Sequence, residues 1–514
     1  MAEYRCGEFC LKILGNTEVD LDALTQEASA KFERYQVYPK SIHRLGGSVM
    51  FIAWIETEKK LVLVDKNPQL TPGFIFDTSM PVAGDWVRIA SLSHANAAVL
   101  RQVFPFTAPV PFGKKGLSIG LGDRLGLASP GHIRVVRPTT ARPVLAQQSV
   151  REITLTNRTF DDVLDAATWA VFQEGYRAGF GADGDHLKTA PEVAAALAAG
   201  YSMITLDCSE KIDNSVATKN AEQLAGAYAT LPGDYRGRIE KAYLGKSFAA
   251  GVGTIQFEAA VLQRLALVYG AALEYTKEIY FDYIKTCPRA LDFELSIDET
   301  ATPTTPEAHY FVAAELVAMG IDVTSLAPRF CGEFQKAIDY IGDLAEFETQ
   351  FKVHAAIADA FGYRLSIHSG SDKFGVYPII ARYTAGRVHV KTAGTNWLEA
   401  IKVIAREDAA LYRAIHAYAL SHFAEATQYY HVTTNLANIP DLSTLSDSRL
   451  PDLMEQNDAR QMIHITYGVI LTAKGPDGEL LFRPAIYALL EAKEEGYAEQ
   501  LGRHIGKHLR LLGQ

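Results

Sequence analysis

Four residues that could perform acid–base or metal chemistry lie within six positions of one another in the segment GADGDHLK. They are Asp183, Asp185, His186 and Lys188. A neutral imidazole is a good ligand for a divalent metal, and a neighbouring carboxylate can act as a base or orient the ligand. The same residues would also suit an ordinary turn, in which an aspartate caps a helix and the histidine and lysine face water. This segment predicts an active site only if other groups of the fold join it.

A second set of acidic residues occupies alternating positions in the segment FELSIDET. In a strand, the period of two puts Glu294, Ser296 and Asp298 on one face and the apolar residues between them on the other. If the strand belongs to a closed barrel, its apolar face meets the helices and its acidic face points inward. An inward carboxylate needs a metal, a cation or water, so Glu294 is a candidate functional residue.

A third polar group follows the apolar run of the segment LSIHSGSDKF. His368 ends the run, and Ser369, Asp372 and Lys373 belong to the polar loop behind it. Serine and glycine expose backbone N–H groups that can hold anionic oxygens. The alternative is a capped turn with a hydrogen-bonded histidine.

Two further segments carry cations that could bind an anion. Arg329 in APRFCGEFQ is a plausible clamp for a carboxylate, and Glu333 or Gln335 behind it could lend an oxygen ligand. Lys391 ends the apolar strand of HVKTAGTNW, where a cation should face a substrate anion or a carboxylate.

Two patterns are rejected as sites of other kinds. The segment SIGLGDRLG is close to a dinucleotide-binding fingerprint, but its glycine spacing is wrong and Asp123 and Arg124 interrupt it. We interpret it as a barrel loop that contacts substrate. His504 and His508 are spaced like two zinc ligands on a helix, but no acidic third ligand stands beside them, so we predict a solvated helix face.

The elements that position these residues alternate between strands and helices. Short β-rich runs end in polar turns and are mostly followed by helical stretches, which is typical of a parallel sheet. The runs lie at 117–123, 177–185, 201–207, 291–298, 322–330, 363–372 and 387–394, with an eighth at either 429–435 or 463–471. This pattern predicts an α/β fold, a (β/α)8 TIM-like barrel with helical insertions and an N-terminal α+β appendage. The strand ends of such a barrel converge on one face, where active sites lie.

The expected organisation has three parts. Residues 1–114 form the α+β appendage, with a helix near 20–35, strands near 49–56 and 60–65, and loops and short strands over 66–114. Residues 115–475 form the catalytic barrel, enlarged by a helical insert over 213–285. Residues 476–514 form helices packed on the barrel, two of them within 485–512.

Composition limits the class of protein. The 514 residues are 48% hydrophobic and 21% charged, as in globular proteins, and the net charge of -10 argues against nucleic acid or an anionic membrane as partner. No apolar run approaches the ~20 residues that cross a bilayer. The N-terminus shows no signal peptide, and the five scattered cysteines, Cys6 and Cys10 among them, fit reduced thiols in the cytoplasm.

Taken together, five segments resemble the tagaturonate epimerases, which interconvert D-tagaturonate and D-fructuronate; related members act on the neutral ketoses tagatose and fructose. The segments are GFGADGDHLKT, GLGDRLGLASPGHI, LSIDET, IHSGSDKF and HVKTAGTNWLEA, and the resemblance runs from about residue 115 to the C-terminus. It implies one divalent metal, Zn, Mn, Ni or Co, held by His186, Gln335 and His368, with Glu333 or His309 as replacements for Gln335. It further implies that Asp185 accepts a proton and Glu294 donates one.

The reaction that the resemblance implies inverts C4 of a ketohexuronate, a carbon whose hydrogen is not acidified by the ketone. We therefore expect a retro-aldol route, in which Asp185 deprotonates the C4 hydroxyl and the C3–C4 bond breaks and re-forms. Lys188, Arg329, Lys373 or Lys391 would hold the substrate carboxylate, and the remaining polar residues expected to contact the sugar are Arg124, Ser209, Ser369 and Asp372. Three alternatives stay open: a neutral-ketose 4-epimerase, a class II-type aldolase and a non-catalytic sugar-acid-binding barrel. The expected partner is a small sugar or sugar acid, and the chain could form a homo-oligomer.

Overall fold

The computed structural model describes residues 35–65, 73–82, 85–249, 253–392 and 394–514. The helix expected near 20–35 lies outside these residues except for Tyr35, and so do Cys6 and Cys10. The chain divides into two units, Met1–Pro109 with Asp161–Gly179, and Val110–Phe160 with Phe180–Gln514. Nothing in the sequence indicates that residues 161–179 belong to the first unit. The two units are described separately.

The first unit contains a six-stranded antiparallel sheet of order β1-β3-β4-β6-β5, with β2 paired to β3. The strands are β1 (Tyr35–Val37), β2 (His43–Leu45), β3 (Ser48–Ile55), β4 (Glu58–Asp65), β5 (Thr78–Val82) and β6 (Asp85–Ser91); the helices are η1 (Pro39–Ser41), α3 (His94–Val103), η2 (Pro105–Thr107) and α6 (Phe160–Gln173). The strands predicted near 49–56 and 60–65 are therefore confirmed as β3 and β4. Alternate residues of β3, such as Met50 and Ile52, pack against α3 and α6. The prediction of only loops and short strands over 66–114 missed α3, which Ser93 caps.

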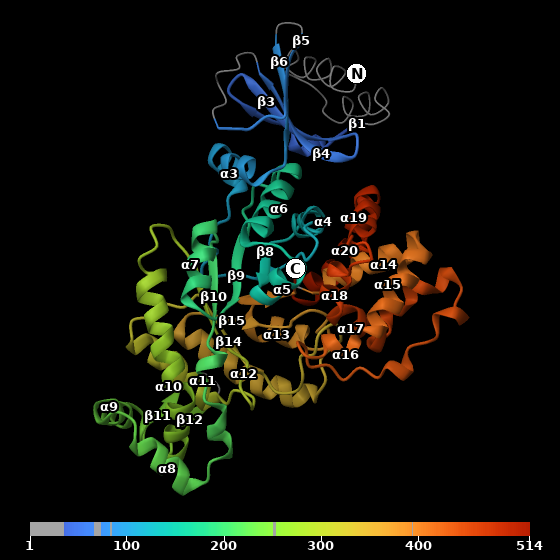
Figure 1. Ribbon diagram of the computed structural model, residues 1–514. Coiled ribbons are helices and arrows are strands. Elements are labelled where there is room, and N and C mark those ends of the chain that lie inside the picture. Colours follow the sequence, from blue (N-terminus) through green and yellow to red (C-terminus); the bar gives the residue numbers. More distant parts are fainter. Residues whose placement is uncertain (1–34, 66–72, 83–84, 250–252, 393) are drawn as a thin grey trace. The chain divides into compact units, whose positions relative to one another are not determined.

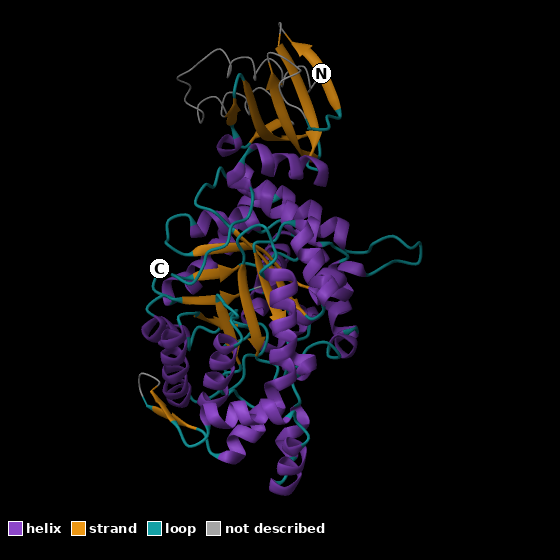
Figure 2. Cartoon of the chain, turned by 90° about the vertical axis from the view of Figure 1, so that its left-hand side faces the viewer, coloured by secondary structure: helices purple, strands orange, loops and turns teal. Residues whose placement is uncertain are grey.

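The second unit is built on a closed barrel of eight parallel strands (Figures 1 and 2). In barrel order they are β10 (Met203–Asp207), β13 (Asp292–Ile297), β14 (Ser325–Pro328), β15 (Arg364–Ile367), β16 (Val388–Lys391), β7 (Ser118–Gly120), β8 (Arg142–Ser149) and β9 (Gly181–Leu187). The barrel confirms the predicted fold class. Each predicted run from 117–123 to 387–394 contains or overlaps one of these strands.

The prediction of the eighth strand is wrong. The strand is β8, whereas 429–435 forms no regular element and 463–471 belongs to the helices α17 (Asn457–Ile465) and α18 (Tyr467–Thr472). Buried residues there, such as Met462, Ile463, Tyr467 and Ile470, recur three to four positions apart, which is the period of a helix. β8 was overlooked because Pro143 and two glutamines weaken its strand pattern.

Helices surround the barrel, and a long insertion between β10 and β13 enlarges it (Figure 1). The helices that follow barrel strands are α4 (Ser129–Val136), α5 (Val150–Thr156), α7 (Ala190–Ala199), α10 (Ala259–Ile279), α11 (Pro306–Ala318), α12 (Leu344–Phe361), α13 (Tyr377–Thr384) and α14 (Thr395–Glu407). The insertion between β10 and β13 contains α10 together with η3 (Ser209–Lys211), η4 (Asn214–Thr218), α8 (Ala221–Ala229), α9 (Gly233–Tyr243), the hairpin β11 (Ser247–Ala249) and β12 (Thr254–Gln256), and the π-helix η5 (Tyr280–Ile284).

A layer of helices after α14 completes the second unit. It comprises α15 (Ala409–Ser421), α16 (Phe423–Ala426), η6 (Leu436–Asn438), η7 (Leu442–Thr444), η8 (Asp447–Glu455), α17, α18, α19 (Arg483–Ala492) and α20 (Glu494–Leu511). The two helices predicted within 485–512 are confirmed as α19 and α20. One apolar cluster joins α14 to this layer through residues such as Trp397, Tyr412 and Leu501, and α20 packs against α4 and α14. The layer thereby brings α17 to the carboxyl ends of the strands.

No helix in the described parts of the chain combines the length and the apolar character needed to span a bilayer. The three described cysteines, Cys208, Cys287 and Cys331, are free thiols, as the sequence predicts.

Candidate active site

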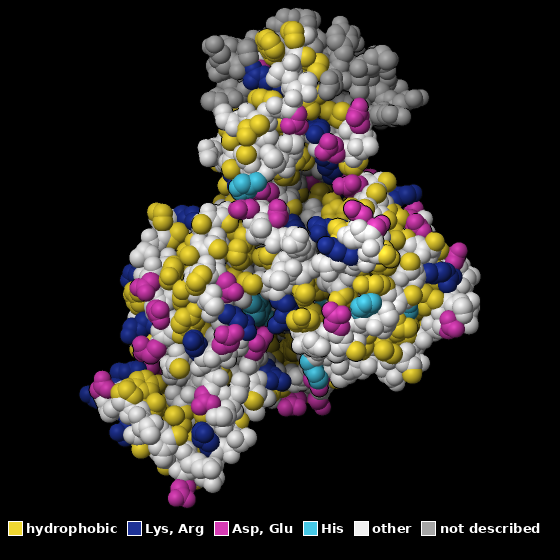
Figure 3. Space-filling model, viewed as in Figure 1, with side chains coloured by type: hydrophobic (Ala, Val, Ile, Leu, Met, Phe, Trp, Pro, Cys, Tyr) yellow, Lys and Arg dark blue, Asp and Glu magenta, His cyan; other side chains and the backbone are white. Residues whose placement is uncertain are grey.

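A cavity of about 700 Å³ opens at the carboxyl ends of the barrel strands. In the space-filling view, a hollow in the barrel unit has basic, acidic and histidine side chains along it (Figure 3). The residues that line the cavity come from most strand ends and include Asp185, His186, Asp298, His368 and Lys391. The polar residues that the sequence placed at successive strand ends therefore do converge.

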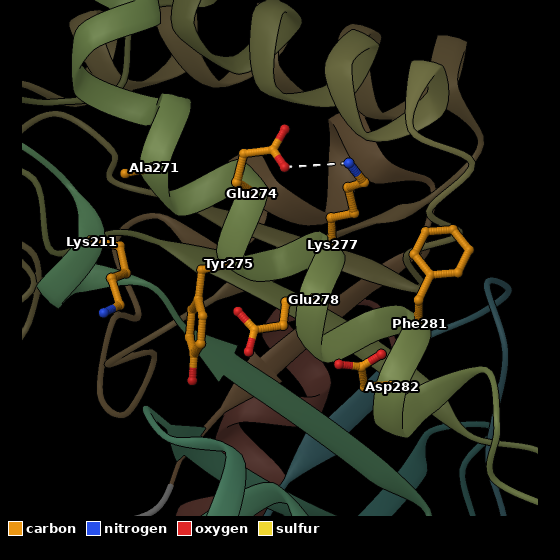
Figure 4. A pocket seen from close by; sticks show the side chains of 8 residues that line it. All are labelled: Lys211, Ala271, Glu274, Tyr275, Lys277, Glu278, Phe281 and Asp282. Carbon is orange, nitrogen blue, oxygen red and sulfur yellow. Dashed lines mark hydrogen bonds and ion pairs between the residues drawn. The ribbon is translucent and has the colours of Figure 1, made fainter.

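Another hollow, on the outer side of α10 and η5, shows what the first cavity has in addition. It measures about 660 Å³, and its lining residues, Tyr275 and Glu278 among them, all belong to α10 and η5 except Lys211 of η3 (Figure 4). Glu274 and Lys277 form an ion pair along one helix face. No histidine or strand end contributes to it, so the barrel cavity is the candidate site.

The floor of the barrel cavity is a cluster of three carboxylates around one ammonium group. Lys391 Nζ lies 2.7 Å from Asp185, 2.9 Å from Asp183 and 3.0 Å from Glu294, and it donates to Thr205 Oγ1 at 2.6 Å. β16 carries the lysine, while β9 and β13 on other parts of the barrel wall carry the acids. Four acceptors surround three ammonium hydrogens, so Lys391 holds the floor together.

The floor has more negative than positive charge. Burial alone would raise the pKa of Asp185 and of Glu294, but the Lys391 ammonium group and the neighbouring histidines together outweigh it and hold both pKa values well below their usual range. Asp183 is affected differently, because burial and the two neighbouring carboxylates together exceed the effect of Lys391 and raise its pKa to about 6. This surplus of carboxylates suits a bound cation.

Asp185 orients His186 at the end of β9. The Nδ1–H of His186 donates to Asp185 Oδ1 at 2.7 Å, and Gln147 of β8 donates to Asp185 Oδ2 at 2.7 Å. A histidine that donates from Nδ1 presents its Nε2 lone pair to a metal, and a carboxylate partner of this kind fixes the tautomer. The backbone of His186 is left-handed, with φ of 55°, which is uncommon for a residue with a side chain.

His368 and Asp298 complete a group of possible metal ligands. His368 Nε2 lies 2.7 Å from Glu294 Oε1, whereas its Nδ1 is buried, has no hydrogen-bond partner and lies 3.3 Å from Asp298 Oδ2. One ligand atom from each of His186, Asp298 and His368 lies within 4.8 Å of the other two. Two imidazole nitrogens and one carboxylate oxygen at this spacing fit a divalent transition metal.

The structure does not add the predicted oxygen ligands to this group. Gln335 lines the cavity, but its amide oxygen already accepts hydrogen bonds from Thr433 N, Thr433 Oγ1 and Gln461 Nε2, each at 3.0 Å. Its amide nitrogen donates to Glu333. His309 uses both ring nitrogens, with His354 at 2.9 Å and Tyr363 at 2.6 Å, and it belongs to α11 outside the cavity lining.

The residues predicted to bind substrate occupy different places. Glu294 is fully buried beneath His368, and Lys373 donates to three backbone carbonyl groups at 2.6–2.9 Å, which uses every hydrogen of its ammonium group. Asp372 lies outside this cavity, where it pairs with Arg460 at 3.0 Å. Neither Asp372 nor Lys373 is placed where it could contact a substrate in the cavity.

The other predicted substrate contacts lie at or beside the cavity wall. Lys188 lines it, donates to Ser209 at 3.0 Å, and has three carboxylates within 3.9 Å. Arg329 lines the cavity and donates to the carbonyl group of Thr300. Arg124 also lines it but is paired with Glu152 at 2.7 Å. Ser369 lines it with a left-handed backbone, φ 49°.

The prediction that His504 and His508 form a solvated helix face is wrong. Both are largely buried, because α20 packs this face beside Asp372 and Glu399. The two histidines and Asp372 also have metal-compatible spacing. His508 nevertheless accepts from Asp372 N at 3.2 Å and donates to the carbonyl group of His504 at 2.9 Å, so both of its ring nitrogens are used.

Sequence reasoning missed several cavity residues, three of which are Gln147, Lys336 and His464. Gln147 belongs to the overlooked strand β8, Lys336 follows Gln335 in a loop, and His464 belongs to the segment that was interpreted as a strand. Recognising the helical spacing of 457–472 would have placed His464 on the same face as Arg460 and Gln461. No local pattern distinguishes Lys336 from a surface lysine.

A family model described as tagaturonate epimerase matches residues 38–512. A tagaturonate/fructuronate epimerase of Thermotoga maritima is 42% identical over 481 residues, which are 93% of this chain and 97% of that protein. The crystal structure of a fructuronate-tagaturonate epimerase from Cohnella laeviribosi with one glycerol is 51% identical, covers 96% of this chain and 99% of its own, and has a TM-score of 0.91. The native crystal structure of that enzyme has a TM-score of 0.90, with 95% and 99% covered.

Proposed function

This chain belongs to the tagaturonate epimerase family, and on that premise we propose that it inverts C4 of D-tagaturonate to give D-fructuronate by a metal-assisted retro-aldol reaction. The family and the relatives make the chain an isomerase that epimerises hexuronates. The observation that carries the proposed mechanism is the group of His186, Asp298 and His368 above a floor of carboxylates, in which the buried His368 Nδ1 makes no hydrogen bond with the described residues and lies 3.3 Å from Asp298 Oδ2.

His186 and His368 are the proposed nitrogen ligands of one divalent metal, Zn, Mn, Ni or Co. Asp298 offers the oxygen that lies with both histidines. Gln335 remains the alternative oxygen ligand, and it would first have to give up hydrogen bonds from Thr433 and Gln461. When bound, the metal supplies Lewis acidity that stabilises negative charge developing on substrate oxygens.

Asp185 is the proposed acceptor of the C4 hydroxyl proton. It lines the cavity, and Lys391 and Gln147 hold its carboxylate ionised and fixed. Loss of that proton breaks the C3–C4 bond, leaving an enediolate of C1–C3 and a three-carbon aldehyde of C4–C6. The aldehyde rotates, C3 attacks its other face, and the proton returns to the new C4 oxygen. Every atom of the substrate is retained.

Glu294 has no exposed surface, so its part in the proton transfer is indirect. Lys391 contacts Asp185 at 2.7 Å and Glu294 at 3.0 Å, and His368 contacts Glu294 at 2.7 Å. When Asp185 accepts a proton and loses its negative charge, Glu294 can therefore still compensate the charge of Lys391, which contacts both carboxylates. Direct donation by Glu294 would require His368 to move.

The isotopic outcome at C4 tests the mechanism. Turnover of tagaturonate in D2O should give fructuronate without deuterium at C4, because the retro-aldol route keeps that hydrogen, and a carbonyl trap should capture the three-carbon aldehyde. Deuterium at C4 would mean that the C–H bond is broken, and the mechanism would be wrong. Comparing rates on tagaturonate and tagatose separates the uronate epimerase from a neutral-ketose epimerase, and release of the two fragments would identify an aldolase.

The three free thiols among the described residues support a reducing compartment, and we propose a cytoplasmic location for the enzyme.

A further inference from the structure

Six cationic side chains line the barrel cavity, and they differ in how their charge is compensated. Arg124 pairs with Glu152, Lys188 has three carboxylates within 3.9 Å, and Lys391 lies among the three acids of the floor. Arg151, Arg329 and Lys336 have no carboxylate oxygen of the described residues within 4.0 Å. Only these three cations have charge available for a carboxylate of the substrate.

Lys336 differs from the two arginines by its surroundings. Its ammonium group donates to Ser369 Oγ at 2.8 Å, which leaves two hydrogens without an acceptor among the described residues. Arg151 is exposed, donates to the carbonyl group of Tyr429 at 3.1 Å and lies over the ring of Tyr430. Ser369 directly follows the proposed metal ligand His368. Lys336 is therefore fixed beside the reacting centre.

His464 also lines this cavity, and one buried nitrogen of its ring is unused. Its side chain is buried, with 1% of the residue exposed, and its Nδ1 has no hydrogen-bond partner. Arg124 approaches Nε2 at 3.5 Å and donates to the carbonyl group of His464 at 3.2 Å, so Nε2 acts as the acceptor and Nδ1 carries the hydrogen. Burial, followed by the charges of Arg124 and Lys336, holds the pKa of His464 well below its usual range. The ring is thus a neutral N–H donor in a positively charged corner.

Helix α17 holds this corner in place. Gln461 Nε2 donates to the carbonyl group of Lys336 at 3.2 Å and to Gln335 Oε1 at 3.0 Å, one turn before His464 on the same helix. Gly394 lets the histidine come close, because a Cβ atom there would lie 2.1 Å from His464 Cε1 and 2.9 Å from Arg124 Nη2. The corner is built from separate parts of the chain.

We propose that Lys336 and His464 bind the carboxylate group of the sugar acid. The inference rests on the proposed function and adds to it the residues that recognise a uronate. Lys336 supplies a charged hydrogen bond, and the Nδ1–H of His464 supplies a second donor. The substrate carboxylate replaces the counter-ion that Lys336 lacks in the protein. A neutral ketose leaves this cation unpaired in a buried corner, which disfavours its binding.

Binding measurements on charge-removing variants test the subsite. Lys336→Met should weaken binding of tagaturonate to the metal-loaded protein by roughly 10- to 100-fold, the range for losing a charged hydrogen bond. KM should rise more than kcat falls, metal content should stay constant, and Lys336→Arg should recover part of the loss. His464→Phe should weaken binding in the same direction with a smaller effect.

Arg329→Met is the matched comparison, because Arg329 is the other uncompensated cation that is not exposed. If it weakens tagaturonate binding more than Lys336→Met does, Arg329 holds the carboxylate and the inference is wrong. Binding by Lys336→Met within about threefold of wild type would also overturn it. Calorimetry distinguishes failure of the proposed function from failure of the proposed subsite. A wild-type protein that binds tagaturonate without converting it contradicts the epimerase activity. Retained binding of tagaturonate by Lys336→Met contradicts only the subsite.

Discussion

Two histidine–carboxylate clusters in the barrel unit have the same metal-compatible spacing and different character. In His186, Asp298 and His368, and in Asp372, His504 and His508, one ligand atom from each residue lies within 4.8 Å of the others. The first cluster faces the barrel cavity and adjoins a floor of surplus carboxylates, and each cluster contains one buried imidazole nitrogen, His368 Nδ1 or His504 Nε2, that makes no hydrogen bond with the described residues. In the second, Arg460 compensates Asp372, and backbone groups use both ring nitrogens of His508.

The comparison shows that the spacing of ligand atoms does not by itself make a metal site. What distinguishes the cavity cluster, His186, Asp298 and His368, is its place at the barrel cavity together with the surplus of carboxylates beside it. The second group, Asp372, His504 and His508, is called the outer cluster below. It uses the same residue types to join α20 to the loop after β15. The predictions below test this division between a chemical and a structural cluster.

The largest effect is expected from removing a ligand of the cavity cluster. His368→Ala should remove the metal and lower kcat/KM on the order of 10⁴-fold, since Lewis-acid stabilisation is worth several kcal/mol. Metal analysis and an NMR assay with tagaturonate measure both effects. His508→Ala is the matched variant and should keep its metal. Loss of metal from His508→Ala would remove the distinction between the clusters.

The next effect concerns stability of the outer cluster. Arg460→Met leaves the buried Asp372 with His504, 3.4 Å away, as its remaining ion-pair partner and should destabilise the fold by about 3–5 kcal/mol. Denaturant unfolding gives the value, while metal affinity should stay as in wild type. A variant as stable as wild type would show that Asp372 has another counter-charge.

The free energy of unfolding should also depend on pH through Glu399, which lies beside the outer cluster. Burial raises the pKa of this residue from 4.5 to about 7, against a hydrogen bond from Gln500 that lowers it. The charged and titratable groups around it are Asp372, Lys402, Arg460 and His504. The folded state holds the proton more tightly than the unfolded state, so this residue makes stability fall as pH rises from about 4.5 to 7.

Glu399→Gln should therefore flatten that part of the stability profile. Above pH 7 the variant should be more stable than wild type by up to about 3 kcal/mol, from 1.36 kcal/mol per pKa unit. Unfolding free energies measured from pH 4 to 8 test it. An unchanged slope in the variant would assign the pH dependence to another group.

The smallest effect separates the two candidate oxygen ligands of the cavity cluster. Asp298→Asn should weaken metal affinity by more than Gln335→Ala does, with the difference about 10- to 100-fold. Metal titration against a competing chelator measures both. The opposite order would make Gln335 the ligand and Asp298 the partner of His368.

The comparison also shows how far local sequence leads. Period two in FELSIDET correctly turns Glu294 inward, and the strand-end positions of Asp185, His186 and His368 bring them to one cavity, because parallel barrel strands all end at the same face. His504 and His508 have an equally clear helical spacing, but the prediction that they face solvent was wrong. Helical spacing says which residues share a face without saying what covers it.

The sequence by itself determined the barrel, the face on which its polar residues gather and the family to which the chain belongs, because alternation and strand-end chemistry are local properties. Only the tertiary structure decided which charged and polar side chains contact one another. Lys391 proved to be the centre of the acidic floor, since closure of the barrel places β16 opposite β9 and β13. Lys336 and His464 line the same cavity because α17, whose Gln461 donates to the carbonyl group of Lys336, returns to the strand ends from more than a hundred residues away. Charge compensation depends on distances across the fold, which no short segment contains.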